Sequence, residues 1–85
     1  MIDKTALIKQ ASRLMEDEDQ LMCWNFRQAK SLMCEVTKQG NFIDWMKNPL
    51  LQTILSLLTP LVGKSYKVEQ VIKILQEIFK DMSNG

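Results

Sequence analysis

The sequence predicts an all-α protein, a compact bundle of four helices in a single domain over residues 1–85. Two observations lead to this prediction. Apolar residues recur at helical spacing in every segment, whereas the apolar–polar alternation that is typical of strands is missing. In addition, no repeat, linker or low-complexity tract divides the 85 residues, and a chain of this length forms one domain with a small core.

The first helix is expected over residues 4–16. Asp3 is a favourable N-cap. The apolar stripe of this helix consists of Leu7, Ile8, Ala11, Leu14 and Met15. If the helix continued, Glu18 and Asp19 would lie on the same stripe, and burying carboxylates without partners is costly. We therefore expect the stripe to end near its last methionine.

The acidic run over 16–19 is interpreted as a turn followed by the start of a second helix. Asp17 would be the N-cap of that helix, and Gln20 would complete a capping box. Glu18 and Asp19 would then lie in the first turn, where the positive end of the helix favours them. Because the run has no glycine and no EF-hand spacing, we do not expect a metal site.

The second helix is expected over 18–39, with Gly40 as its C-terminal stop. At 100° per residue, its core face consists of Leu21, Met22, Phe26, Ala29, Leu32, Met33 and Val36. Trp24 does not lie on that face. It points to the opposite half of the helix, together with Arg27, Gln28, Ser31 and Glu35.

Cys23 and Cys34 are the only cysteines and fall within the same expected helix. Eleven residues separate them along the chain, which is roughly 16 Å of helix. A disulfide needs Cα atoms within about 7 Å, so these two cysteines are not expected to pair with each other. The cysteine content fits a reducing compartment, and we expect a cytoplasmic protein. Nearby Lys and Arg residues leave the reactivity of both thiols open.

A short helical turn is expected over 42–47, either as a fifth helical segment or as a crossing at one end of the bundle. Asn48 and Pro49 then form a clear restart, an N-cap followed by proline at the first helical position. Further on, Pro60 and Gly63 mark the end of the third helix and the loop that follows. Leu61 and Val62 are expected to cover an end of the core.

The third helix is expected over 49–58, inside a stretch from Asn48 to Gly63 that carries no charge. One broad side consists of Leu50, Leu51, Ile54, Leu55, Leu57 and Leu58. The other side consists of Gln52, Thr53, Ser56 and Thr59. A surface helix normally carries charged residues on its outward face, so this polar but uncharged side indicates that something other than water covers it. Either the other helices of the chain or another molecule would do so.

The fourth helix is expected over 67–82. Its apolar stripe consists of Val68, Val71, Ile72, Leu75, Ile78, Phe79 and Met82, and its polar face of Glu69, Lys73, Gln76, Glu77 and Lys80. This pattern is typical of an ordinary amphipathic helix.

The residue inventory argues against an enzyme. The chain has no histidine, no glycine-rich phosphate loop and no CxxC motif, and we expect neither a catalytic residue nor a cofactor. The formal net charge of +1 gives no strong field for nucleic acid, and the helix after the Gly40 turn is rich in Leu, so nucleic-acid binding is not favoured. No apolar run is long enough to span a bilayer, and the charged N-terminal segment does not resemble a signal peptide.

The residues expected to bind a partner are Trp24, Arg27, Ser31, Gln52 and Ser56. They point to a small regulator, adaptor or inhibitor that binds a protein or self-associates into a helical oligomer. The opposing interpretation is intramolecular: Trp24 packs under the segment after Gly40, and the third helix is wrapped by its neighbours.

Two further functions remain open from the sequence. The first is a small anionic or nucleotide ligand held near Trp24, Arg27 and Tyr66, with Lys30 as a second cation. The second is a peripheral membrane protein that uses the third helix at the interface. This is less favoured because such helices typically carry Lys or Arg on their polar face.

Overall fold

The computed structural model describes residues 2–84 and confirms an all-α bundle. Its helices in chain order are α1 (Lys4–Asp17), α2 (Trp24–Gln39), the 3₁₀ turn η1 (Gly40–Phe42), α3 (Pro49–Leu58), the 3₁₀ turn η2 (Thr59–Leu61) and α4 (Tyr66–Asn84).

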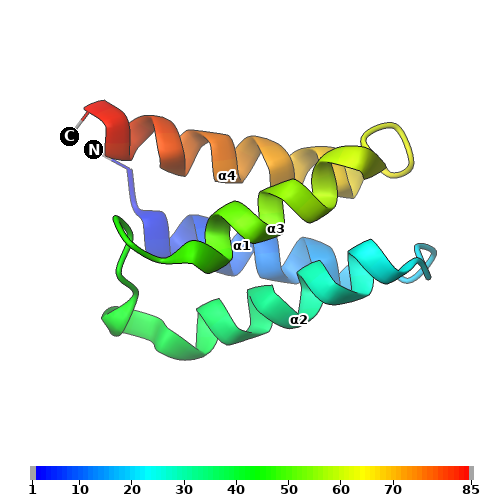
Figure 1. The fold of residues 1–85 in the computed structure, drawn as a ribbon, viewed down its shortest axis with the longest axis horizontal. Coiled ribbons are helices and arrows are strands. Elements are labelled where there is room, and N and C mark those ends of the chain that lie inside the picture. The colour runs from blue at the N-terminus through cyan, green and yellow to red at the C-terminus, as the bar shows by residue number, and fades with distance from the viewer. Residues whose placement is uncertain (1, 85) are drawn as a thin grey trace.

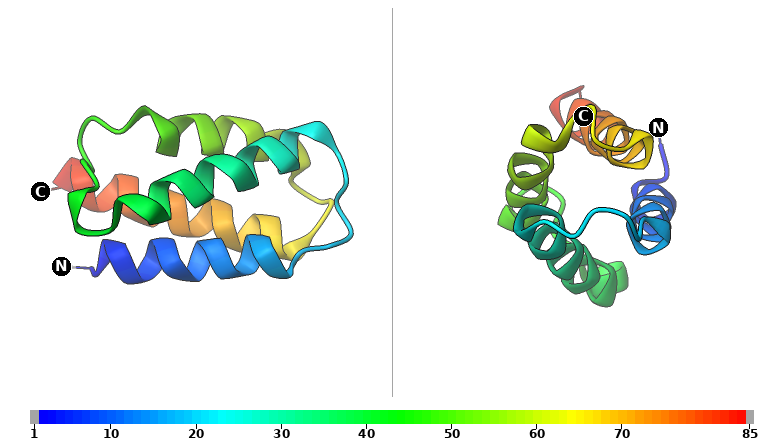
Figure 2. Two further views of the ribbon diagram at one scale, coloured as in Figure 1. Left: turned by 90° about the horizontal axis from the view of Figure 1, so that it is seen from below. Right: turned by 90° about the vertical axis from the view of Figure 1, so that its right-hand side faces the viewer.

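Consecutive α-helices run in alternating directions and surround a common interior (Figures 1 and 2). α1 packs mainly against α4, and α2 mainly against α3. The start of α1 and the end of α4 lie at the same end of the bundle, where Lys4 Nζ lies 2.8 Å from a carboxylate oxygen of Asp81. This ion pair holds the pKa of Asp81 below its ordinary value.

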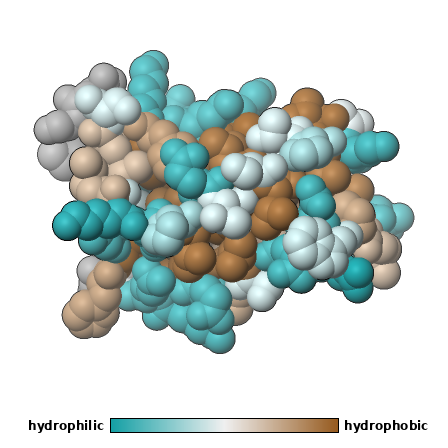
Figure 3. All heavy atoms as spheres, viewed as in Figure 1, coloured by the Kyte–Doolittle hydropathy of each residue, from teal (hydrophilic) through white to brown (hydrophobic). Residues whose placement is uncertain are grey.

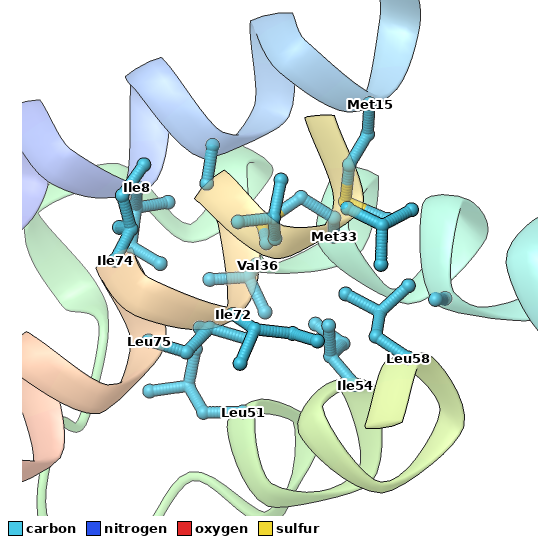
Figure 4. Close-up of a cluster of buried hydrophobic side chains, with 14 of the residues drawn as sticks. Ile8, Met15, Met33, Val36, Leu51, Ile54, Leu58, Ile72, Ile74 and Leu75 are labelled. Atoms are coloured by element: carbon cyan, nitrogen blue, oxygen red, sulfur yellow. The ribbon is translucent and has the colours of Figure 1, made fainter. Parts of the chain in front are cut away.

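The core is formed by the apolar stripes of all four helices (Figure 4). Its largest fully buried side chains are Ile8, Met15, Phe26, Met33, Val36, Leu51, Ile54, Leu58, Val68, Val71, Leu75 and Ile78. All of them belong to the stripes that the sequence predicted. The structure adds Ile74 of α4, which is also buried.

The predicted start of the second helix is wrong by six residues. α1 continues to Asp17, which is its last residue and not an N-cap, and α2 begins only at Trp24 with Cys23 at the N-cap position. Residues 18–23 form the connection between the two helices. Met22, predicted to face the core, is 75% exposed in this connection.

The reason for this difference is Glu18, a buried carboxylate that has partners. Glu18 as a whole is only 6% exposed. The backbone N–H of Gln20 donates to one of its oxygens at 2.8 Å, and the Ser65 hydroxyl donates to the other. Burial without partners is costly, but these donors compensate Glu18 and hold its pKa below the ordinary value, the Ser65 hydroxyl most strongly.

The segment between α2 and α3 contains no α-helix over 42–47. Gly40 ends α2 with a backbone φ of 55°, as expected for a C-terminal glycine, and the chain continues into η1. Phe42 is 92% exposed, whereas Ile43 is buried in the core. A side-chain oxygen of Asp44 accepts from the backbone N–H groups of Met46 and Lys47, which stabilises a non-helical turn over 45–47.

The restart at α3 is as predicted. Asn48 Oδ1 accepts from the N–H of Leu50 at 3.0 Å, and Pro49 occupies the first turn. Beyond α3, the helical path continues into η2 through Pro60 instead of stopping before it. Leu61 covers an end of the core as expected, but Val62 is exposed.

Candidate partner-binding surface

The outward face of α2 exposes Trp24, Arg27 and Ser31. Trp24 is 59% exposed and lies at the first position of the helix. The core-facing residues Phe26, Ala29, Met33 and Val36 point to the opposite side. Three of the five predicted partner-binding residues therefore share one exposed helix face, and the Trp24 ring is not packed under the segment after Gly40.

A groove of about 320 Å³ lies between α1 and α2, next to that face. Its lining residues are Ser12, Met15 and Glu16 of α1 and Arg27, Lys30, Ser31, Met33 and Cys34 of α2. Met15 and Met33 are almost fully buried and close its floor. The other side chains form the two walls, so the groove has an apolar floor and polar sides.

The walls of the groove carry charges that are not paired with each other. Arg27 and Lys30 stand on the α2 wall, and Glu16 stands on the α1 wall. Within residues 2–84, no ion pair or side-chain hydrogen bond involves any of the three. The amino group of Lys30 lies 5.7 Å from the centre of the Phe26 ring, a cation–π distance that positions this half-buried cation at the groove.

Gln52 and Ser56 lie elsewhere, on the outer side of α3. Both are exposed, as are Thr53 and Thr59, so the described part of the chain does not cover this uncharged face. Gln52 borders a shallow hollow of about 250 Å³ whose other lining residues are Met46, Phe79, Met82 and Ser83. Figure 3 shows this side of the molecule, with hydrophobic surface on both sides of α3.

The five predicted residues thus belong to two surfaces. Arg27 and Ser31 line the α1–α2 groove, and Gln52 borders the hollow at the α3–α4 side. The residues suggested for a small ligand are also separated, because Tyr66 and Trp24 are exposed but do not line the groove that contains Arg27 and Lys30.

The α1 wall of the groove was not foreseen. The sequence gives no local signal for Ser12 and Glu16, which lie on an ordinary polar flank of an amphipathic helix. The available signal is that the first two helices follow each other closely along the chain, because two helices joined by a short connection pack as antiparallel neighbours. Reading these helices as neighbours places the flank of α1 beside Arg27.

Both cysteines are exposed free thiols. Within the described part of the chain, no three carboxylate or cysteine side chains come close enough to hold a metal ion. Across residues 2–84, the helices are too short or too polar to cross a bilayer.

Comparisons of the chain with protein families, with curated proteins and with solved structures find no match.

Proposed function

We propose that this protein is a small non-enzymatic interaction domain that binds a protein partner through the outward face of α2. The observation that carries the proposal is the exposure of Trp24 on the same helix face as Arg27 and Ser31, beside a groove with unpaired charges. Tryptophan and arginine are enriched among the residues that dominate binding energy at protein interfaces.

The proposal is supported by the cost of leaving such a side chain in water. A tryptophan buries a large apolar area when a partner covers it, while its indole N–H still finds an acceptor at the rim of an interface. A single exposed apolar residue is common on small domains, so Trp24 alone would carry little weight. Its position beside the groove is what distinguishes it from Tyr66, another exposed aromatic residue on a different helix.

A small anionic ligand is the second candidate, and the groove is what favours it. Arg27 and Lys30 supply two cations, and Ser12 and Ser31 supply two hydroxyl donors around the same space. A thermal-shift series with phosphate, citrate and nucleotides at constant ionic strength separates the two candidates. Stabilisation that disappears in Arg27→Gln supports the ligand, because binding to the folded state alone raises its stability.

The experiment that tests the main proposal is affinity capture from an extract of the source cells with three versions of the chain. These are the unchanged protein, Trp24→Ala and the matched control Tyr66→Ala. We expect Trp24→Ala to lose the captured partner and Tyr66→Ala to retain it, at equal amounts of folded protein. Equal capture by both variants would contradict the proposed role of the α2 face.

The interaction domain could instead bind a second copy of itself, and this self-association would use Gln52 and Ser56 on α3. A two-fold symmetric interface brings the same surface of two copies together, and an uncharged helix face avoids placing like charges against each other. Light scattering over a range of concentrations tests this form. Concentration-dependent dimers that a Ser56→Glu variant abolishes support it, whereas a monomer at all concentrations removes it.

A further inference from the structure

Cations follow the length of the α1–α2 groove. On α2, Arg27 and Lys30 line it, and Lys38 lies one helical turn beyond Cys34 on the same side. On α1, Lys9 lies three residues before Ser12 and so continues the opposite wall.

Few acidic groups offset these cations along the groove. Glu16 is the one acidic residue among the lining residues. Lys38 has a weak contact with Glu35, at 3.9 Å between exposed groups. The protein as a whole is almost neutral, with 11 basic and 10 acidic residues. The positive character of the groove is therefore local.

The groove lies between two neighbouring helices, and such a site can receive a third helix. α1 and α2 are antiparallel neighbours that pack less closely with each other than α1 does with α4 or α2 with α3. Side chains of a third helix fit between two such helices, with the apolar face against the floor. Met15 and Met33 close the floor and are each only 1% exposed, so much of the apolar contact comes from the aliphatic stems of Arg27 and Lys30 on the wall.

We propose that the α1–α2 groove binds an acidic amphipathic helix of a protein partner, whose carboxylates pair with Arg27 and Lys30. The charge of the groove selects the acidic class, because the two lining cations lack an acidic partner within residues 2–84. A basic helix would place its cations against Arg27 and Lys30. The repulsion between these like charges disfavours a basic helix more strongly than ion pairing favours an acidic one. The inference rests on the proposed function and names the partner chemistry for the same side of α2.

The probe is a pair of synthetic amphipathic peptides of sixteen residues, the length of α2. One carries leucines on its apolar stripe and glutamates on both flanks, and its twin carries lysine in place of every glutamate. We expect the unchanged protein to bind the acidic peptide about tenfold more tightly than the twin in fluorescence anisotropy at physiological salt. The double variant Arg27→Glu/Lys30→Glu is expected to reverse this preference.

The matched control is Lys73→Glu/Lys80→Glu on the exposed face of α4, which changes the net charge by the same amount. This control is expected to keep the preference of the unchanged protein, so a general effect of charge is separated from the groove. Arg27→Gln/Lys30→Gln is measured as well and should abolish the preference without reversing it. Circular dichroism confirms that each variant is folded.

The two cysteines locate the bound peptide. Cys34 lines the groove, whereas Cys23 is exposed outside it. The acidic peptide should slow alkylation of Cys34 severalfold and leave the rate at Cys23 unchanged. Protection of both thiols or of neither one contradicts binding in the groove.

The proposal is overturned if neither peptide binds at about 1 mM, or if the acidic preference persists in Arg27→Glu/Lys30→Glu. The proposal is also overturned if single-stranded RNA binds more tightly than the acidic peptide and displaces the peptide. That result would identify nucleic acid as the partner. The proposed function fails separately, when Trp24→Ala captures its partners unchanged. If Arg27→Glu/Lys30→Glu still prefers the acidic peptide while Trp24→Ala loses its captured partner, only the acidic-helix proposal is contradicted and the proposed function stands.

Discussion

The Ser65 hydroxyl donates a hydrogen bond to the Glu18 carboxylate and so joins the two loops at one end of the bundle. The same serine oxygen accepts from the backbone N–H of Lys67 at 3.2 Å, in the first turn of α4. The Lys67 amino group in turn donates to the backbone carbonyl of Asp17, at the end of α1, at 3.0 Å. The end of α1 and the start of α4 are therefore held together by polar contacts, close to where the connection to α2 begins.

Replacing Glu18 tests this arrangement. Glu18→Ala leaves the Gln20 N–H and the Ser65 hydroxyl without their acceptor, whereas Glu18→Gln keeps an acceptor oxygen. We expect the urea midpoint to fall most in Glu18→Ala and less in Glu18→Gln and Ser65→Ala. Asp19→Ala, at an exposed neighbour, is the control. A midpoint for Glu18→Ala equal to that of the control would contradict the structural role of this carboxylate.

The pH dependence of stability should report the same carboxylate. Because the folded pKa of Glu18 lies below the ordinary value of 4.5, the unfolded chain takes up the proton first as the pH falls. The stabilisation is therefore complete above pH 4.5 and is lost progressively below it. The pKa of Asp81 also lies below its ordinary value of 3.8, so its contribution to stability is likewise lost as the pH falls below 3.8.

Chemical denaturation between pH 7 and pH 3 measures this loss. The decrease in the free energy of unfolding should begin at lower pH in Glu18→Gln than in the unchanged protein, and Asp81→Asn should remove the later part of the decrease. If the free energy of unfolding decreases identically with falling pH in Glu18→Gln and in the unchanged protein, then Glu18 has the same pKa in the folded and unfolded states.

Glu18 also shows why the sequence misplaced the start of the second helix. The periodic pattern correctly placed Glu18 on the buried side of α1. The cost of burying a lone carboxylate argued instead for Glu18 in the first turn of a new helix, whereas it directly follows the last residue of α1. Its compensating partner, Ser65, lies 47 residues away along the chain. No local pattern reports such a contact. The core stripes needed only local periodicity, and the sequence predicted them well.

For the candidate surface, too, local periodicity predicted which residues are exposed but not which helix lies next to them. Helical spacing placed Trp24, Arg27 and Ser31 on the side of α2 away from the core, and the structure has them exposed. Spacing within one helix cannot tell which neighbour borders that side. The groove needs Ser12 and Glu16 from α1, so it appears only when the packing of the two helices is known.

A pair of substitutions on α3 separates its two faces. Ile54 is fully buried, and Ser56, two residues later, is exposed. Ile54→Ala is expected to cost about 2–5 kcal/mol of unfolding free energy, because it removes buried methyl and methylene groups and leaves a cavity. Ser56→Ala should change stability by no more than about 0.5 kcal/mol. Denaturant titrations of both variants check this, and a large effect of Ser56→Ala would show that the uncharged face is structural.

Substituting Gly40 tests the backbone conformation at the end of α2. Its φ of 55° lies in a region that residues with a side chain rarely adopt, and a Cβ at this position would meet no atom within 4 Å. The cost of Gly40→Ala is therefore one of backbone conformation, about 1–3 kcal/mol. Gln70→Ala, on the exposed side of α4, is a neutral control. Equal stability of the two variants would show that the chain leaves α2 along a different path.

The two thiols provide a test of how far α2 extends as a continuous helix. Cys23 is at its N-cap position and Cys34 lies near its third turn, so roughly 16 Å of helix separates them. Both should react with a thiol reagent in the native protein without denaturant, because both are exposed. Mild oxidation should give dimers linked through disulfides and no intrachain bridge, since a bridge needs Cα atoms within about 7 Å. Non-reducing mass spectrometry distinguishes the two products. An intrachain disulfide formed in high yield would require α2 to unwind, and would contradict the helix that carries the proposed surface.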